Sequence, residues 1–390
     1  MGIHTRVGRE DADKTESSPN AKTAMVFNRV AIVGVGLIGG SLGLALKRMG
    51  FEGQVVGVSR DETTALALDL GVIDEGYPYE QLPVAVSKAD LVFLCTPIER
   101  ILQLLPQVMA SVAEGAVVTD VGSTKRMIVA EAARRSRDGV YFIGGHPMAG
   151  SEKAGVTAAD PFLFQNAIYI LVPDQRVPEA KHHALVEMVR QLGAKVFQLS
   201  VDDHDEVVAA VSHLPQVMAT TLVEMVGEMN EEGDGRFLPL AAGGFRDLTR
   251  IASSPFSPVW EDICATNRDR IVDTIDRYIA KLRSIRDKVG EATLADDFEY
   301  ANSVRDRIPR DAKGFLHTLF EILVVAEDKP GVIAEIASVL STEGVNINDI
   351  EVVKVREGEG GTLRLGFDSD AAATLALGLL GKLGYQARRP

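Results

Sequence analysis

A histidine and a serine in two separate loops have the side chains needed for acid–base chemistry. His146 lies in Gly144-Gly-His-Pro147, and a histidine followed by proline in such a glycine-rich segment is not expected inside a helix. An imidazole has an ordinary pKa of about 6.5, which suits a general base at neutral pH. Ser123 could orient this imidazole or hydrogen-bond a substrate. The alternative for His146 is a turn residue bonded to backbone.

Two lysines adjoin these loops. Lys125 follows Ser123 by two residues, and Lys153 follows the histidine loop. Lysine ammonium groups are almost always solvated. We therefore expect both side chains to face water rather than a ligand.

A second group of polar residues lies in a region of helical pattern. Pro215, in Val211-Ser-His-Leu-Pro-Gln216, should kink the helix and free backbone groups, as is tolerated beside a cavity. His213 is either a satisfied core histidine or a ligand for a substrate. Arg250 is a candidate for bidentate carboxylate binding. Its alternative role is a surface salt bridge with an acid such as Asp247.

A glycine pattern near the start of the chain predicts a phosphate-binding turn. An apolar run from Arg29 leads into Gly34-x-Gly36-x-x-Gly39, and a helical pattern follows. The three glycines suit a tight turn, close approach of a pyrophosphate and packing of helix on strand, and the helix N–H groups favour the anion. We expect a dinucleotide here, bound at residues Gly34, Gly36, Leu37, Ile38 and Gly39.

The end of the second strand bears on the choice between NAD and NADP. This strand ends in Ser59-Arg60, where dinucleotide-binding folds usually carry an acid for the ribose. A hydroxyl followed by a guanidinium suits a 2′-phosphate, so NADP has at least equal weight with NAD. Alternatively, both residues face solvent and Asp61 takes the acidic role. Thr96 and Pro97, after a further strand, should wall the nicotinamide side.

The elements that position these residues follow from hydrophobic periodicity. Apolar runs alternate with amphipathic helices up to Leu199, which predicts a parallel, doubly wound sheet of the Rossmann type. Strands are expected at 54–58, 90–95, 116–120, 140–143, 167–172 and 195–199, and the main helices beyond them at 206–226 and 260–289. The last 70 or so residues read strand, helix, strand, strand, helix, strand, a ferredoxin-like βαββαβ unit. The expected parts are a disordered tail (1–27), a dinucleotide-binding domain (28–200), a helical domain (201–303), a linker (304–316) and a small C-terminal domain (317–390).

Composition limits the class of protein. The 390 residues carry a net charge of −14, and the scattered Lys and Arg give no footprint for nucleic acid. The two cysteines, Cys95 and Cys264, lack metal-ligand spacing, so we expect no metal and no disulfide. No apolar run approaches the roughly 20 residues that span a bilayer. A cytoplasmic protein without membrane contact is the expectation.

Five motifs in order resemble the prephenate/arogenate dehydrogenase family of tyrosine biosynthesis. The resemblance runs from about Val30 to Arg286. A later segment, Val325 to Ile336 with Gly344 to Asn348, resembles an ACT domain, a small ligand-sensing module. The motifs are Gly34-Val-Gly-Leu-Ile-Gly-Gly-Ser41, Asp120-Val-Gly-Ser-Thr-Lys125, Gly145-His-Pro-Met-Ala-Gly-Ser151, Ser212-His-Leu-Pro215 and Gly244-Phe-Arg-Asp-Leu-Thr-Arg250.

The resemblance implies oxidative decarboxylation of a cyclohexadienol with hydride transfer to NAD or NADP. It implies that His146 accepts the C4 hydroxyl proton, that Ser123 holds hydroxyl and imidazole in register, and that Arg250 binds a substrate carboxylate. His213 and Gln216 would lie at the substrate. Several members have a histidine in place of Gln216, so the preference for prephenate or arogenate stays open. Trp260 would approach the pocket of the partner subunit in a homodimer built through the helical domains.

For the ACT-like unit, the resemblance implies an amino-acid site. Asp328 and Gly331 ahead of a helix, with Asn346 and Asn348 beside them, could hold the charged groups of an amino acid. Tyrosine, the end product, is the expected ligand. The alternative is an inert dimerisation module.

Two other functions remain open from the sequence. One is a different nicotinamide enzyme, such as a 3-hydroxyacid-type dehydrogenase, although these rely on a helical lysine rather than a loop histidine. The other is a non-catalytic sensor of dinucleotide and amino acid.

Overall fold

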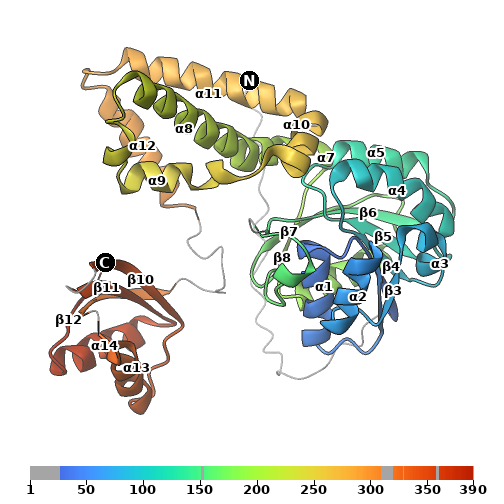
Figure 1. Ribbon diagram of the computed structural model, residues 1–390, viewed down its shortest axis with the longest axis horizontal. Helices are drawn as coiled ribbons and strands as arrows, with labels where there is room; N and C mark the ends of the chain where they lie inside the picture. Colours follow the sequence, from blue (N-terminus) through green and yellow to red (C-terminus); the bar gives the residue numbers. More distant parts are fainter. Residues whose placement is uncertain (1–26, 151–152, 309–318, 328, 357–359, 390) are drawn as a thin grey trace, which may run out of the picture.

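The computed structural model describes residues 27–150, 153–308, 319–327, 329–356 and 360–389, and these form three successive units (Figure 1). The predicted tail therefore lies outside the described residues, except for Phe27. That side chain is 3% exposed and packs in the core of the first unit, so the domain begins one residue earlier than predicted.

The first unit is an eight-stranded sheet in the order β3-β2-β1-β4-β5-β6-β7-β8. The short strand β3 was not predicted, because three residues with a central glycine carry no alternating pattern. The strands are β1 (Arg29–Val33), β2 (Gln54–Val58), β3 (Glu75–Tyr77), β4 (Leu91–Leu94), β5 (Val117–Asp120), β6 (Tyr141–Pro147), β7 (Ile168–Val172) and β8 (Lys195–Gln198).

Helices cover both faces of this sheet, as the doubly wound prediction requires. One apolar core lies under α1, α2 and α6, and a second lies under α3, α4 and α5. The helices are α1 (Leu37–Arg48), α2 (Asp61–Asp69), α3 (Leu82–Val86), α4 (Ile98–Ser111), α5 (Arg126–Arg134) and α6 (Glu179–Gln191).

The alternation of strands and helices predicted a wholly parallel sheet, but one pair of strands is antiparallel. Strands β1 to β6 pair in parallel, but β7 runs antiparallel to β6, and β8 follows β7 in parallel. A parallel pair needs a crossover connection, usually a helix. In its described part, the connection between β6 and β7 holds only the short 3-10 turn Val156–Ala158, so the chain turns back.

The second unit is helical. Its first helical run is interrupted between α7 (Val201–Val208) and α8 (Leu214–Glu232) by a π-helical turn at Ala209–His213. This irregularity lies just before Pro215, where the sequence predicted a kink, because proline supplies no N–H to the helical ladder. The run Val201–Glu232 contains an 18-residue window with a mean hydropathy of 1.2, so by length and composition alone it would be able to cross a membrane.

The rest of the helical unit departs from prediction in two places. Asn267 separates two helices where the sequence predicted one, and α12 continues to Arg305, inside the predicted linker. Residues 309–316 of that linker lie outside the described residues. The helices are α9 (Gly243–Thr249), α10 (Glu261–Thr266), α11 (Arg268–Asp287) and α12 (Leu294–Arg305).

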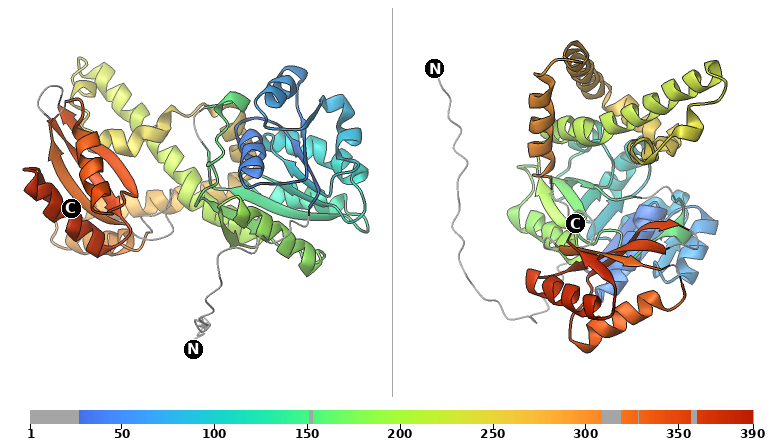
Figure 2. Two further views of the ribbon diagram at one scale, coloured as in Figure 1. Left: turned by 90° about the horizontal axis from the view of Figure 1, so that it is seen from below. Right: turned by 90° about the vertical axis from the view of Figure 1, so that its left-hand side faces the viewer.

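The third unit has the predicted βαββαβ order, and Figure 2 shows its layers from two further sides. Its antiparallel sheet has the order β10-β11-β9-β12, and both helices contribute to a single apolar core on one face. The elements are β9 (Phe320–Ala326), α13 (Val332–Thr342), β10 (Asp349–Arg356), β11 (Gly360–Phe367), α14 (Asp370–Lys382) and β12 (Gln386–Arg388).

Candidate active site

The glycine turn has the geometry that a dinucleotide site requires. Gly34 has a φ of 97°, and a Cβ on Gly39 would lie 2.1 Å from the carbonyl oxygen of Gly34, so neither position accepts a side chain. A Cβ on Gly36 would meet nothing within 4 Å. Helix α1 begins at Leu37 with no side-chain cap and no acid in its first turn. Its N–H groups are therefore available to an anion over an open glycine.

The neighbouring strand ends lie where the sequence placed them. Thr96 packs against the glycine turn: a Cβ on Gly34 would lie 2.7 Å from the methyl carbon of Thr96. Pro97 directly precedes α4. At the end of β2, Ser59 is buried, whereas Arg60 is exposed directly before α2. The guanidinium of Arg60 is thus the more accessible of the two predicted ribose contacts.

His146 is buried at the end of β6, and its Nδ1 lies 2.9 Å from Nε2 of His204. The Nδ1 of His204 in turn lies 2.8 Å from Oδ1 of Asp205. The side chains of His204 and Asp205 are 0% and 1% exposed. Three side chains from β6 and α7 thus form one buried hydrogen-bonded row that ends on an acid.

The acid of this row is anchored on a helix terminus. Asp205 accepts hydrogen bonds from the backbone N–H groups of Lys125 (2.7 Å) and Arg126 (3.0 Å), at the start of α5. Helix α5 has no side-chain cap of its own, so the Asp205 carboxylate satisfies these donors from another unit of the protein. This contact fixes the start of α7 against the loop that carries Ser123.

Electrostatics leave the row with one ionised carboxylate and neutral imidazoles. Burial alone would raise the pKa of Asp205, but hydrogen bonds from His204 and the two backbone N–H groups outweigh it and lower that pKa. Burial lowers the pKa of His204 against the opposing pull of Asp205. Burial also lowers the pKa of His146 well below its ordinary value, and His204, Lys125 and His213 add to the effect. His146 is therefore neutral, as a base must be.

Lys125 is not solvated, contrary to the sequence-based expectation. Its side chain is fully buried and its Nζ pairs with the carboxylate of Asp120 at the end of β5. Asp120 also accepts the backbone N–H of Gly145, the residue before His146, at 3.1 Å. Lysine propensities predict exposure because an unpaired ammonium is costly to bury, and here a buried acid offsets that cost.

Ser123 is half-buried in the loop between β5 and α5. Among the described residues it makes no hydrogen bond to His146, whose Nδ1 is instead occupied by His204. Its predicted role in holding the substrate hydroxyl remains a prediction.

The predicted residues of the helical unit form a connected group. The buried ring of His213 meets Trp260 edge-on, with ring centroids 5.9 Å apart, and its Nδ1 lies 3.4 Å from the amide nitrogen of Asn267. Asn267 also donates to the backbone oxygen of Asp205 at 2.8 Å. Burial lowers the pKa of His213 to about 4. His213 is thus a packed, neutral histidine adjoining the row of His146.

Gln216 connects this group to Arg250. The buried amide of Gln216 donates to the backbone oxygen of Ile251 at 3.0 Å, which holds the turn that begins at Arg250 against α8. Arg250 itself is exposed. The family resemblance implies that Arg250 and His146 both reach the substrate, and their convergence on one cleft remains a prediction.

Sequence reasoning missed His204, Asp205 and Asn267. The signal was present in Ser200-Val-Asp-Asp-His-Asp205, where a histidine and an acid lie one turn before the apolar Val208 on the buried side of α7. Acidic residues are common in the first turn of a solvated helix, so this pattern offered no reason to expect His204 and Asp205 to be buried.

The predicted amino-acid site of the third unit is partly described. Asp328 lies outside the described residues, whereas Gly331 has a φ of 96° and directly precedes α13. Asn346 is exposed, and Oδ1 of the half-buried Asn348 has no hydrogen-bond partner among the described residues. An unpaired, half-buried oxygen leaves room for a donor from a ligand.

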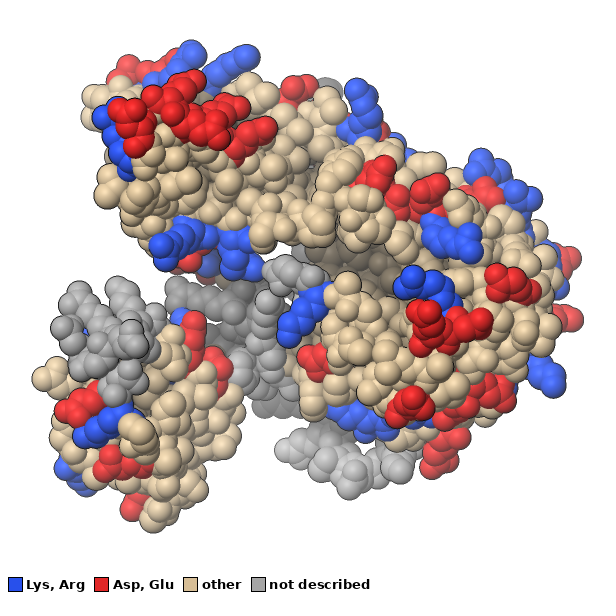
Figure 3. Space-filling view, in the orientation of Figure 1, with Lys and Arg blue, Asp and Glu red and all other residues tan. Residues whose placement is uncertain are grey.

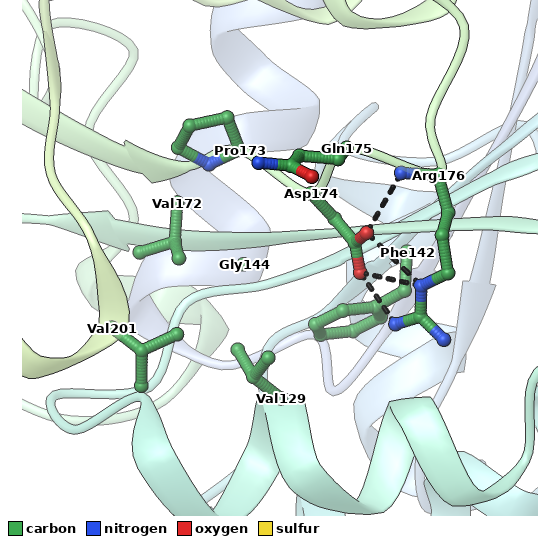
Figure 4. Close-up of a pocket in the computed structure, with 9 residues that line it drawn as sticks. All are labelled: Val129, Phe142, Gly144, Val172, Pro173, Asp174, Gln175, Arg176 and Val201. Carbon is green, nitrogen blue, oxygen red and sulfur yellow. Dashed lines mark hydrogen bonds and ion pairs between the residues drawn. The ribbon is translucent and has the colours of Figure 1, made fainter.

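A cavity of about 400 Å³ is lined by none of the predicted site residues (Figure 4). Two of its polar side chains, Asp174 and Arg176, pair with each other at 2.5 Å. The lining residues are Val129, Phe142, Gly144, Val172, Pro173, Asp174, Gln175, Arg176 and Val201.

Comparison with known proteins decides the family. Family models describe residues 42–198 as a prephenate dehydrogenase nucleotide-binding domain, 200–300 as its dimerization domain, and 320–376 as an ACT domain. The chain is 37% identical over 351 residues to prephenate dehydrogenase of Bacillus subtilis, covering 87% of this chain and 92% of that protein. The chain belongs to the prephenate dehydrogenase family.

Other relatives show the range of this family. Cyclohexadienyl dehydrogenase of Zymomonas mobilis is 32% identical over 298 residues, 73% of this chain and 98% of that protein. A structure of prephenate dehydrogenase from A. aeolicus, in complex with hydroxyphenyl propionate and NAD+, matches with a TM-score of 0.68 and 29% identity, over 74% of this chain and all of that one. Synechocystis arogenate dehydrogenase matches with a TM-score of 0.63 and 30% identity, over 72% and 100% of the two chains.

Proposed function

We propose that this protein catalyses the oxidative decarboxylation of prephenate or arogenate, with hydride transfer to NAD or NADP. The observation that carries the proposal is the neutral, buried imidazole of His146, held through Nδ1 at the end of a strand in a nucleotide-binding sheet. Family membership supplies the substrate class, since relatives bear the names prephenate, cyclohexadienyl and arogenate dehydrogenase.

The chain's own residues would divide the work as follows. His146 takes the proton of the C4 hydroxyl while hydride leaves C4, the ring carboxylate departs as CO₂ and the ring becomes aromatic. A base of this type contributes about 10²–10⁴-fold to the rate. Ser123 holds the same hydroxyl, and Arg250 binds a substrate carboxylate through its planar pair of donors. The bound nicotinamide supplies the hydride acceptor.

The cofactor site fits a dinucleotide. The open space over Gly36 and the uncapped start of α1 admit a pyrophosphate, with Leu37, Ile38 and Gly39 supplying the first backbone groups of the helix. The exposure of Arg60 supports a contact with a 2′-phosphate, which keeps NADP beside NAD. Thr96 and Pro97 would border the nicotinamide side.

We further propose a homodimer built through the helical unit. The family model for residues 200–300 describes a dimerization domain, and α8 leaves Val223, Met225 and Met229 exposed. Such a face accounts for the apolar 18-residue window within Val201–Glu232, of which only 28% is buried within this chain. Trp260 would then approach the partner's pocket while it packs on His213 in its own subunit.

Tyrosine is the proposed ligand of the ACT domain, at Gly331, Asn346 and Asn348, with Asp328 as a further expected contact. The unpaired Oδ1 of Asn348 supports an amino group as its partner. The test is calorimetry and steady-state kinetics with added tyrosine; unchanged kinetics and no heat of binding would make the domain structural. A cytoplasmic location stays part of the proposal.

The decisive experiment is the activity of purified protein in four pairings, prephenate or arogenate with NAD or NADP. Absorbance at 340 nm should rise in at least one pairing. In that pairing, His146→Asn should lower the turnover number by about 10²–10⁴-fold and retain the affinity for the cofactor. No rise in any pairing would favour another dehydrogenase or a sensor. Full activity of His146→Asn would remove the imidazole from the base role.

A further inference from the structure

We propose that His204 and Asp205 are positioning residues, which together hold His146 in the one tautomer that can act as a base. The inference rests on the proposed role of His146. The two residues come from the start of the helical unit, whereas His146 lies on a strand of the nucleotide-binding unit. His204 is 2.9 Å from His146, and Asp205 is 2.8 Å from His204.

The direction of the row is set at Asp205. Its carboxylate accepts two backbone N–H groups at the start of α5, and the Arg126 guanidinium lies 3.8 Å away. A carboxylate at a helix N-terminus with these donors stays ionised, so it only accepts hydrogen bonds. Facing it, Nδ1 of His204 must therefore carry a proton.

The remaining protons follow in sequence. A neutral imidazole has one N–H, so with Nδ1 protonated, Nε2 of His204 is a bare acceptor. Nδ1 of His146 lies 2.9 Å from that acceptor and must be the donor. The proton of His146 is then on Nδ1, which leaves its Nε2 with a lone pair for the substrate hydroxyl.

The same row stabilises His146 after it has taken a proton. The charge of Lys125 disfavours the resulting imidazolium. The Asp205 carboxylate, connected through His204, offsets this, as does Asp120 paired with Lys125. The arrangement is that of an acid orienting a catalytic histidine, with one imidazole inserted between them.

Two substitutions at position 204 separate orientation from packing. In His204→Gln, the side-chain oxygen can still accept from Nδ1 of His146 while the amide donates to Asp205. In His204→Phe, the ring volume is kept but the acceptor is lost, which favours the opposite tautomer of His146. His183→Gln and His183→Phe are matched controls, because His183 lies exposed on α6.

We expect His204→Phe to lose about 100-fold or more in kcat, the lower range for loss of a general base, with the KM for cofactor nearly unchanged. His204→Gln should recover most of this loss, and both His183 variants should match the unchanged enzyme. Near-normal kcat in His204→Phe, or equal losses in both His204 variants, would overturn the inference. The proposed function would survive either result, because it depends on the activity matrix and on His146→Asn.

A spectroscopic measurement covers the case in which His204→Phe does not fold. Long-range nitrogen–proton NMR spectra of histidine-labelled enzyme distinguish the two imidazole tautomers, and His146→Asn assigns the signal. We expect the proton of His146 on Nδ1 in the unchanged protein. A proton on Nε2 would refute the proposal even if every variant were inactive.

Discussion

The ammonium of Lys125 and the carboxylate of Asp120 form an ion pair inside the protein, immediately beside the strand that carries His146. Removing one member of a buried pair leaves the other charge uncompensated, at a cost of about 3–5 kcal/mol. We therefore expect Lys125→Met to lower the free energy of unfolding by this amount, measured by chemical denaturation.

The control for this prediction is built into the pair. Adding Asp120→Asn to Lys125→Met removes the uncompensated carboxylate, so it should restore part of the lost free energy of unfolding. Lys88→Met on the exposed surface should change the free energy of unfolding by less than about 0.5 kcal/mol. A Lys125→Met protein as stable as the parent would mean that the pair contributes nothing.

The pH profile of activity should reflect the depressed pKa of His146. Burial, reinforced by His204, Lys125 and His213, keeps the imidazole neutral as pH falls through the ordinary histidine range. We expect kcat/KM to stay level down to about pH 6.5 and to fall only well below it. An acid limb at or above that value would contradict the lowered pKa.

Stability should also decline on the acid side. His146, His204 and His213 all have folded-state pKa values below the ordinary value, so the unfolded chain binds these protons first. Stability is then full above about pH 6.5 and is lost as pH falls, with each such histidine contributing a slope of about 1.4 kcal/mol per pH unit. Denaturation series at stepped pH measure this slope, and His213→Asn should reduce it. A flat profile between pH 6.5 and 5 would contradict the prediction.

Arg250→Ala should chiefly raise KM for the substrate. A hydrogen bond between charged groups contributes about 1.5–3 kcal/mol, which corresponds to an increase of about 10- to 100-fold. Steady-state kinetics measure it, with Arg283→Ala on α11 as an exposed control. If kcat collapses while KM stays the same, the arginine acts in the transition state instead.

Arg60→Ala should weaken NADP selectively, because only NADP carries the 2′-phosphate that a guanidinium would bind. Titration of each cofactor against the variant, by fluorescence or calorimetry, gives the two dissociation constants. Asp61→Ala is the companion variant, since a selective loss of NAD there would assign the ribose to that acid. Equal effects of Arg60→Ala on both cofactors would argue against a phosphate contact.

The sequence predicted those parts of the protein that depend on local pattern. The glycine turn, the strands β1, β2, β4, β5 and β6 and the βαββαβ unit are confirmed, because each follows from residue type and periodicity. At the kink predicted around Pro215, the structure has a π-helical turn. The reversal of β7 depends on a connection without periodic signal. The burial of Lys125 and the contact of His204 with His146 depend on partners 5 and 58 residues away, which no local pattern encodes.

The π-helical turn at Ala209–His213 has an evolutionary consequence. A π-helical turn is closed by i→i+5 hydrogen bonds, so it takes up one residue more than a regular turn while the helix on either side keeps its path. Deleting one position there would close the run into a regular α-helix and leave the contact of Gln216 with Ile251 in place. This stretch would thus let lineages gain or lose one residue in a single step while the surrounding scaffold stays intact.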